Sequence, residues 1–282
     1  MAHATGAPFA ETPTRFIEVD GARIAYRELG RGSGIPLVAL THLGANLDDW
    51  DPRVADGLAA GRRVILLGYR GVGRSTGRVR STIREMADDA VAAVRALGLA
   101  TVDLFGLSMG GMVAQEIVRT SAHLVRRLVL VSAGPAGGPR LVGMTRVMVG
   151  GTARAILARR DPKADLFFTR SDVGRRAAAA YRARLRERSA EKDGPVGLTV
   201  LRAQLAAVHR WGLADAAPVS AFAGDVTVFH GDSDRMVPAS NASALLRVFP
   251  AASVTVLPDA GQGVVFQNHP EIVAAVRAFL RR

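Results

Sequence analysis

The 282-residue sequence contains no cysteine, so disulfide bonds, thiolate nucleophiles and cysteine-ligated metals are excluded. Aromatic residues make up only 5% of the chain. No apolar run approaches the ~18 residues that a membrane-spanning helix needs. Residues 1–14 also lack the basic start and apolar run of a signal peptide. We therefore expect a cytoplasmic protein with no membrane partner, and a flexible N-terminal tail over residues 1–14.

Lysine is nearly absent, since only Lys163 and Lys192 accompany the many arginines that give a formal net charge of +12. Clustered basic residues are the usual footprint of nucleic-acid binding. Here the arginines are scattered, and no helix-turn-helix signal, zinc spacing or pattern of stacking aromatics accompanies them. We interpret the charge as a solvated arginine surface and expect no nucleic-acid partner. Whether the chain forms a homodimer is left open.

Short apolar runs alternate with amphipathic helical stretches, a pattern that predicts an α/β fold with a doubly wound, mainly parallel sheet. Phe16–Val19 and Ile24–Leu29 predict an opening hairpin with Asp20-Gly21 as its turn. Buried strands are predicted over residues 36–41, 63–67, 102–105, 128–132, 226–230 and 253–257. These runs are short, apolar and bounded by turn residues, as strands covered on both faces are.

Two helices have clear boundaries: one from Thr82 to Leu97, with a capping box at its start, and a last one that begins near Pro270. Between residues 134 and 224 the alternation of strands and helices stops, and Ala- and Arg-rich helical stretches replace it. We predict one α/β core, formed by residues 15–133 and 225–282, with an inserted helical cap over residues 134–224. About 14 basic and about 6 acidic residues lie between residues 154 and 210, so the cap carries much of the excess charge.

The strongest local motif is Gly106-Leu107-Ser108-Met109-Gly110, which follows a predicted strand and precedes a predicted helix. In a G-x-S-x-G nucleophile elbow, the glycines permit a sharp turn that presents the serine hydroxyl at the end of the sheet. The alternative is a merely structural turn, which the strand–turn–helix context disfavours. With this motif the sequence resembles the α/β-hydrolase fold family, from about residue 15 to the C-terminus. The resemblance implies an eight-stranded sheet with Ser108 in the nucleophile position.

The same resemblance implies two further parts of an active site. The segment 41–46, followed by Trp50-Asp51-Pro52, resembles the oxyanion segment of the family. By analogy, the backbone N–H groups of Met109 and of Gly44 or Leu43 would hold a developing oxyanion. The loop after the strand that ends at His230 resembles the acid loop, and its spacing implies Asp234, rather than Asp232, as the catalytic acid.

The histidine loop departs from the family pattern. Residues 258–263 and Phe266 match it, but Gln262 stands where the family has its catalytic histidine. An amide has no useful proton affinity near pH 7, so serine activation loses its general base. Losing a triad base costs roughly 10⁴ to 10⁶ in rate in serine proteases. A second departure is Gly68, where the family usually has Asp. The two departures favour natural divergence, and a His-to-Gln variant of a working hydrolase is the alternative.

Several cap residues are candidates for the substrate pocket. His209, near the end of the cap, is the best substitute base, and His42 belongs to the oxyanion segment. We predict a pocket lined by His42, His209, Trp211, Met144 and Met148. The alternating Arg182, Arg184, Arg186 and Arg188 are interpreted as a solvated helix face rather than an anion site.

No Walker-type loop, H-E-x-x-H motif or cluster of metal ligands occurs, so we expect neither a metal nor a cofactor. Three functions remain. The first is an enzyme of atypical α/β-hydrolase type that binds a bulky, largely apolar small molecule under the cap and promotes cyclisation, addition or carbon–carbon chemistry, in biosynthesis or tailoring. The second is a serine esterase or lactonase with a substitute base or a replaced histidine. The third is a non-catalytic small-molecule binding protein.

Overall fold

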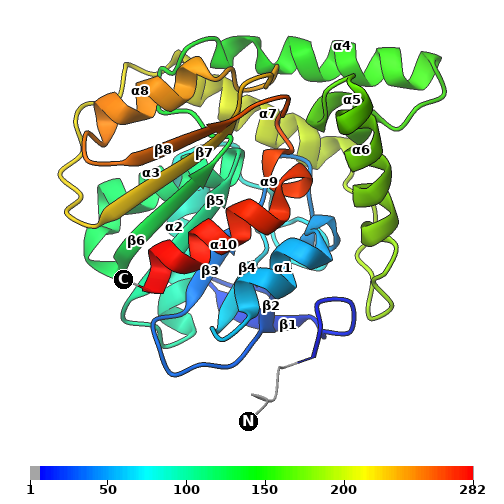
Figure 1. The fold of residues 1–282 in the computed structure, drawn as a ribbon. Coiled ribbons are helices and arrows are strands. Elements are labelled where there is room, and N and C mark those ends of the chain that lie inside the picture. The colour runs from blue at the N-terminus through cyan, green and yellow to red at the C-terminus, as the bar shows by residue number, and fades with distance from the viewer. Residues whose placement is uncertain (1–6, 282) are drawn as a thin grey trace.

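The computed structural model describes residues 7–281 and contains one eight-stranded sheet (Figure 1). The strands lie in the order β1-β2-β4-β3-β5-β6-β7-β8. Their bounds are β1 Arg15–Val19, β2 Ala22–Leu29, β3 Leu37–Leu40, β4 Val64–Leu67, β5 Val102–Leu107, β6 Val125–Val131, β7 Asp225–Gly231 and β8 Ser253–Leu257. From β4 to β8 every neighbouring pair is parallel, whereas β2 is antiparallel to both β1 and β4. The doubly wound, mainly parallel sheet is confirmed.

The opening hairpin forms where the sequence predicts it. Asp20 and Gly21 both have positive φ, 45° and 71°, the conformation of a type I′ turn that matches the twist of the two strands. Strands β3, β4 and β5 are buried along their whole length, because helices cover both faces of the sheet. Strand β6 begins three residues before the predicted start at residue 128. The prediction started late because Arg126 and Arg127 interrupt the apolar run that identifies the strand.

Helices cover the two faces of the sheet. Helices α1 (Pro52–Ala59) and α10 (His269–Arg281) pack together on the face toward the viewer in Figure 1, and α2 (Ile83–Ala96) and α3 (Met109–Ser121) pack together behind it. Thr82 caps α2 by accepting a hydrogen bond from Glu85 N, as its capping-box spacing predicts. The remaining elements of this part are α8 (Ser240–Val248), α9 (Val264–Gln267) and the 3₁₀ turns η1 (Leu47–Asp49) and η2 (Ala122–Leu124).

Between β6 and β7 the regular secondary structure of the described chain is entirely helical. The helices are η3 (Leu141–Gly143), α4 (Met144–Leu157), α5 (Pro162–Phe167), α6 (Asp172–Leu185) and α7 (Leu198–Leu213). We call residues 134–224 the cap. In Figure 1, α4 runs along the top of the molecule, and α5 and α6 descend on the right. No helix within residues 7–281 has the length and apolarity to cross a membrane.

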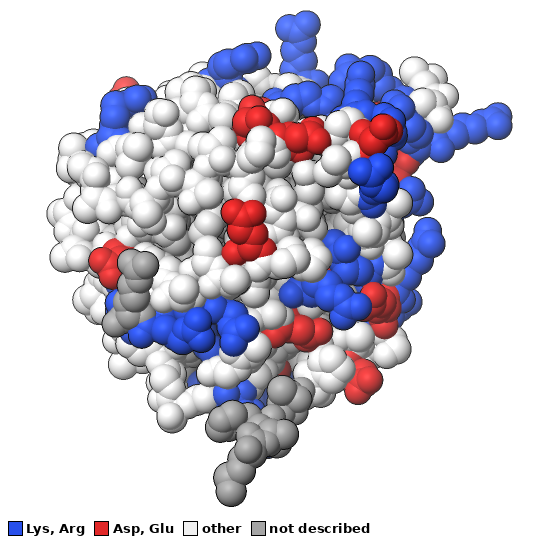
Figure 2. Space-filling model, in the orientation of Figure 1, with Lys and Arg blue, Asp and Glu red and all other residues white. Residues whose placement is uncertain are grey.

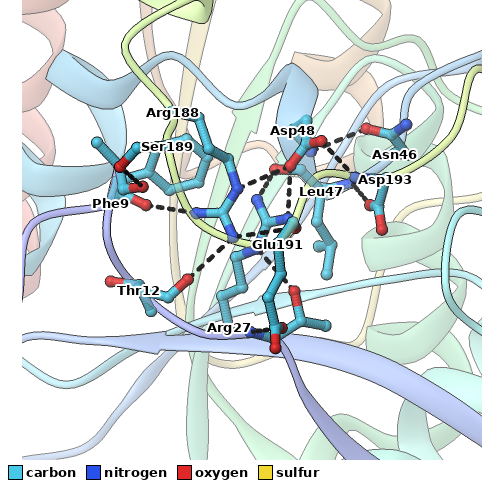
Figure 3. Close-up of polar contacts among 12 residues, drawn as sticks. Phe9, Thr12, Arg27, Asn46, Leu47, Asp48, Arg188, Ser189, Glu191 and Asp193 are labelled. Carbon is cyan, nitrogen blue, oxygen red and sulfur yellow. Dashed lines mark hydrogen bonds and ion pairs between the residues drawn. The ribbon is translucent and has the colours of Figure 1, made fainter.

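The expected flexible tail is wrong for residues 7–14, and residues 1–6 lie outside the described part of the chain. Phe9 is 1% exposed, and its backbone N–H donates to the Asp56 carboxylate at 2.7 Å. The Arg188 guanidinium donates to the carbonyl oxygens of Phe9 (2.7 Å) and Thr12 (3.0 Å), as Figure 3 shows. An arginine 179 residues away in the sequence thus binds the N-terminal segment to the cap.

The solvated-face interpretation of the four alternating arginines is wrong for Arg184 and Arg188. The Arg184 side chain donates to both carboxylate oxygens of Asp51, which also caps α1. Arg188 is buried, and its Nε lies 2.9 Å from an Asp48 carboxylate oxygen. Arg184 lies at the end of α6 and Arg188 lies three residues beyond it, so both ion pairs join this part of the cap to the segment that follows β3.

Candidate active site

Ser108 lies in a strained turn between β5 and α3. Its φ of 56° and ψ of −118° are costly for a residue with a side chain. Gly106 and Gly110 make the turn sterically feasible. A Cβ on Gly106 would lie 2.5 Å from the Gly110 carbonyl oxygen, and a Cβ on Gly110 would lie 2.2 Å from the Leu40 carbonyl oxygen. The nucleophile-elbow geometry is therefore present, with Ser108 at the carboxyl end of the central strand and 4% exposed.

Asp234 follows β7 and is buried, and no Lys or Arg within residues 7–281 forms an ion pair with it. One carboxylate oxygen, Oδ1, accepts hydrogen bonds from the backbone N–H groups of Met236 and Val237, each at 2.9 Å. The other oxygen, Oδ2, has no hydrogen-bond partner among the described residues. Burial raises the pKa of Asp234 to about 8, against the lowering effect of the two backbone donors. Asp234 is therefore mostly a neutral carboxylic acid at pH 7.

His230 is the imidazole beside Asp234, with its Nε2 at 3.7 Å from Asp234 Oδ2. This nitrogen donates to the Val237 carbonyl oxygen at 2.7 Å, which places the proton on Nε2. Burial lowers the pKa of His230, so the ring is neutral. Because its donor is already used by a backbone carbonyl, His230 does not supply the charge that would ionise Asp234.

Gln262 is buried in the loop after β8, at 2% exposure. Its side-chain Nε2 donates to the Ser132 carbonyl oxygen at 3.2 Å, and its Oε1 has no partner among the described residues. Within this part of the chain, no hydrogen bond joins Gln262 to Ser108 or Asp234. The amide is thus held by the end of β6 rather than linking the acid to the serine, as a triad histidine does.

The backbone N–H groups of Gly44 and Leu43, the two candidates from the oxyanion segment, differ in their hydrogen bonding. Gly44 N donates to Oε1 of Gln204, a residue of cap helix α7, at 2.7 Å. Among residues 7–281, Leu43 N has no such acceptor. Met109 is the first residue of α3, so its N–H has no acceptor within the helix. An oxyanion would therefore find Met109 N–H and Leu43 N–H open, and Gly44 N–H occupied.

Sequence reasoning missed Gln204, which is fully buried. The sequence gives one signal for a role of this residue: Gln204 is polar but lies on the same buried face of α7 as Ala207 and Val208. At 100° per residue, His209 lies about 140° around this helix from Gln204, so it does not share the face that reaches the oxyanion segment. The helix geometry thus disfavours His209 as a substitute base.

His42 lies beside Phe266 of the histidine loop. Its ring meets Phe167 edge-on at 4.9 Å between centroids and Phe266 at 6.3 Å. Nδ1 lies 2.9 Å from the Leu43 carbonyl oxygen and is therefore the protonated nitrogen, while the buried Nε2 has no partner in the described chain. Burial lowers the pKa of His42, so the ring is neutral, with an unshared electron pair on Nε2.

The remaining predicted pocket residues do not gather at one cavity. Trp211 donates from Nε1 to the Gly134 carbonyl oxygen (3.2 Å) and lines a cavity of about 490 Å³ between α3, α8 and residues 214–222. Met144 is buried and Met148 half-buried on α4, and neither lines that cavity. Ser108 does not line it either.

The second sequence departure has a packing reason. A Cβ on Gly68 would lie 2.7 Å from the Ala25 carbonyl oxygen and 3.3 Å from Ser75 Oγ. An Asp at this position would need the β2 backbone to move. Within residues 7–281, no three His, Asp or Glu side chains lie close enough together to hold a metal ion.

Comparisons with known proteins agree with this architecture. The sequence model of the alpha/beta hydrolase fold matches residues 35–268. The dihydrolipoyllysine-residue acetyltransferase component of the acetoin cleaving system of Pseudomonas putida is 28% identical over 98% of this chain and 72% of its own length. The non-heme chloroperoxidase of Streptomyces lividans is 37% identical, but over 41% of this chain and 43% of its own length. Several relatives therefore match over less than half of their length.

Solved structures give the same result. An alpha/beta hydrolase fold protein from Chitinophaga pinensis superposes with a TM-score of 0.87 at 31% identity, covering 97% of this chain and 99% of that chain. A thermophilic esterase from Thermogutta terrifontis superposes with a TM-score of 0.69 at 22% identity, covering 95% and 98% of the two chains. The second likeness concerns the fold alone.

Proposed function

The chain belongs to the α/β-hydrolase fold family, and from this premise we propose that it is a cofactor-free, non-hydrolytic enzyme for a bulky, largely apolar small molecule. The reaction class is cyclisation, addition or carbon–carbon chemistry on a substrate with an enolate or phenolate character. One observation carries the proposal: Gln262, at the position of the triad histidine, is buried and bound to the Ser132 carbonyl oxygen rather than to Ser108. Serine hydrolysis by the usual relay therefore has no base.

The retained elbow supports an enzyme rather than a decayed site. A strained backbone at Ser108 persists only where the surrounding structure maintains it, and such strain clusters at functional sites. The Ser108 hydroxyl and the N–H groups of Met109 and Leu43 can donate to a developing oxyanion. Donors of this kind, together with positioning, lower a barrier without a strong base. Burial raises the pKa of Asp234, which favours the neutral acid and so reduces the negative charge that would oppose an oxyanion.

A hydrolytic function is the second candidate, and His42 is the observation that favours it. Its Nε2 is buried, unprotonated and without a partner in the described chain, as a resting general base would be. Similarity to relatives with hydrolase names also supports this candidate. One of them is the putative carbamate hydrolase RutD of Rhizobium rhizogenes, which is 29% identical over 39% of this chain. Within residues 7–281, no hydrogen bond joins His42 to Ser108.

Ester hydrolysis separates the two candidates. We would compare the unaltered protein, Gln262→His, and Gln262→His with Ser108→Ala, on p-nitrophenyl acetate and butyrate. The proposal expects negligible Ser108-dependent hydrolysis by the unaltered protein, and a gain of at least about 100-fold in kcat/KM for Gln262→His that Ser108→Ala removes. Rapid Ser108-dependent hydrolysis by the unaltered protein, lost on His42→Ala, would support the hydrolase instead.

A second measurement tests the reaction class itself. The unaltered protein and Ser108→Ala would be incubated with a panel of enol- and phenol-bearing polyketide-like molecules, with products followed by mass spectrometry. A non-hydrolytic cyclisation gives a product of unchanged mass, whereas hydrolysis adds one water. Bound molecules that return unchanged from both proteins, with equal affinity, would favour a binding protein and contradict the proposal.

A further inference from the structure

A second cavity, of about 710 Å³, lies between α4 and the loop after β7, and Ser108 does not line it. Its volume is in the range of small-molecule sites, ~300 to 1,000 Å³. Four arginines are among its lining residues: Arg140, Arg146, Arg154 and Arg235.

The arginines reach the cavity from opposite walls. Arg146, Val147 and Arg154 recur at helical spacing, so one side of α4 forms the first wall. Arg235, in the loop after β7, belongs to the second wall. Figure 2 shows basic side chains gathered along the upper and right-hand edges of the molecule, where Figure 1 places α4, α5 and α6.

The positive charge of this cavity is not neutralised by the protein. Within residues 7–281, no carboxylate lies within ion-pair distance of Arg146, Arg154 or Arg235. The nearby Asp165 carboxylate pairs with Arg160 at 2.8 Å, and Arg235 donates to the backbone carbonyl of Asp165 instead.

The carboxylates of the lining do not balance the arginines either. Burial raises the pKa of Asp234 to about 8, so this buried carboxyl group adds little negative charge near pH 7, and Asp232 is the exposed carboxylate that shares the cavity with four guanidinium groups. Burial, together with the like charges of Arg170 and Arg154, lowers the pKa of Arg235. Like charges held together without counter-ions are destabilising, and a bound anion would relieve the repulsion.

We propose that this cavity binds an organic anion, whose phosphate or carboxylate group is held between Arg154 and Arg235. The guanidinium fork binds both groups through paired, charge-assisted hydrogen bonds. Val147 and Leu166 provide apolar contact for an organic body. Ser108 does not line the cavity and Asp234 reaches it only from the loop after β7, so the inference does not depend on the reaction proposed for Ser108.

Binding measurements at constant ionic strength test this site without any need for turnover. The probes are phenyl phosphate, phenylacetate and inorganic phosphate, measured by titration calorimetry on the full chain. We expect one of the two organic anions to bind the unaltered protein, and Arg154→Gln and Arg235→Gln each to weaken it about 10-fold or more. The better of the two organic probes identifies the anionic group.

Arg176→Gln is the matched control, because Arg176 is an exposed cap arginine outside the cavity lining. The affinity of this variant should stay within about twofold of the unaltered protein, because Arg176 is exposed like Arg154 and Arg235 but does not line the cavity, and a screened charge at a distance contributes little. Equal weakening by Arg176→Gln would mean non-specific attraction to a basic surface, and unchanged affinity in Arg154→Gln and Arg235→Gln would also overturn the site. If inorganic phosphate binds as tightly as phenyl phosphate, the cavity does not recognise the organic part of the anion, which would contradict the proposal.

Discussion

At the scale of single residues, the site depends on where protons reside. Asp234 Oδ2 and Gln262 Oε1 are both buried oxygens without a partner among residues 7–281. For the carboxyl group, protonation is the less costly state, because an unpaired buried charge is expensive to desolvate. Having glutamine at the histidine position therefore affects the acid as well as the base, since Asp234 Oδ2 lacks the N–H donor that a triad histidine would supply.

Asp234 should make the protein less stable as the pH rises. Its pKa is about 8 in the folded protein and near 3.8 in the unfolded chain, so between these values the native state holds one more proton. Stability is then highest at acidic pH and falls until about pH 8, by about 6 kcal/mol at most. Asp234→Asn should remove this slope and raise the melting temperature at pH 8 to 9.

Thermal unfolding from pH 5 to 9 measures this effect, with Asp232→Asn as control because Asp232 is exposed in the same loop. The Asn side chain keeps an acceptor for Met236 N and Val237 N. A melting temperature of Asp234→Asn that falls with pH as steeply as that of the unaltered protein would show that Asp234 is already ionised.

The sequence predicts which residues occupy the motif positions, but not the hydrogen bonds that they make. Ser108 and Gln262 could be located because their neighbours follow a fixed pattern of glycines. The Ser132 carbonyl as the acceptor of Gln262, and Gln204 as the acceptor of Gly44 N–H, are contacts between segments distant in the chain. No local spacing reports such contacts.

At the scale of elements, the predicted strands were found because each is a short apolar run between turn residues. The cap was harder to predict, since its helices are Ala- and Arg-rich and their buried faces are narrow. Arginine spacing in α6 was misread for the same reason. A guanidinium can be buried when several acceptors surround it, and the acceptors of Arg188 come from the N-terminal segment and from Asp48.

Arg188→Met should therefore be costly, although it removes a charge from a basic protein. The change leaves Asp48 with one cation fewer and the carbonyls of Phe9 and Thr12 without their donor. Breaking a buried ion pair on one side costs about 3 to 5 kcal/mol. Arg186→Met, two residues away and exposed, should change the free energy of unfolding by less than about 0.5 kcal/mol.

Chemical denaturation of both variants provides the comparison. Equal free energies of unfolding for Arg188→Met and Arg186→Met would mean that Arg188 does not hold the N-terminal segment in solution. Arg27 also forms an ion pair with Asp48. Because this pair remains in Arg188→Met, it reduces the loss in the free energy of unfolding below that of a fully broken pair.

At the scale of the whole molecule, burial is uneven between core and cap. Eleven of the 13 residues of α3 are buried, against three of the 14 residues of α4, where Val149, Ile156 and Leu157 are exposed. Local opening requires little free energy where few apolar contacts are lost. The amide protons of α4 should therefore exchange with solvent by local opening, while those of α3 should exchange only near the free energy of global unfolding.

Hydrogen–deuterium exchange read by mass spectrometry measures this difference peptide by peptide. We expect α4 to take up deuterium at least about 100-fold faster than α3, which corresponds to a difference of about 3 kcal/mol or more in opening free energy. An organic anion between Arg154 and Arg235 would join α4 to the loop after β7, so saturating phenyl phosphate or phenylacetate should slow exchange in α4 and leave α3 unchanged. If α4 and α3 exchange together without ligand, the cap and core open as one unit, and α4 has more tertiary support than its burial indicates.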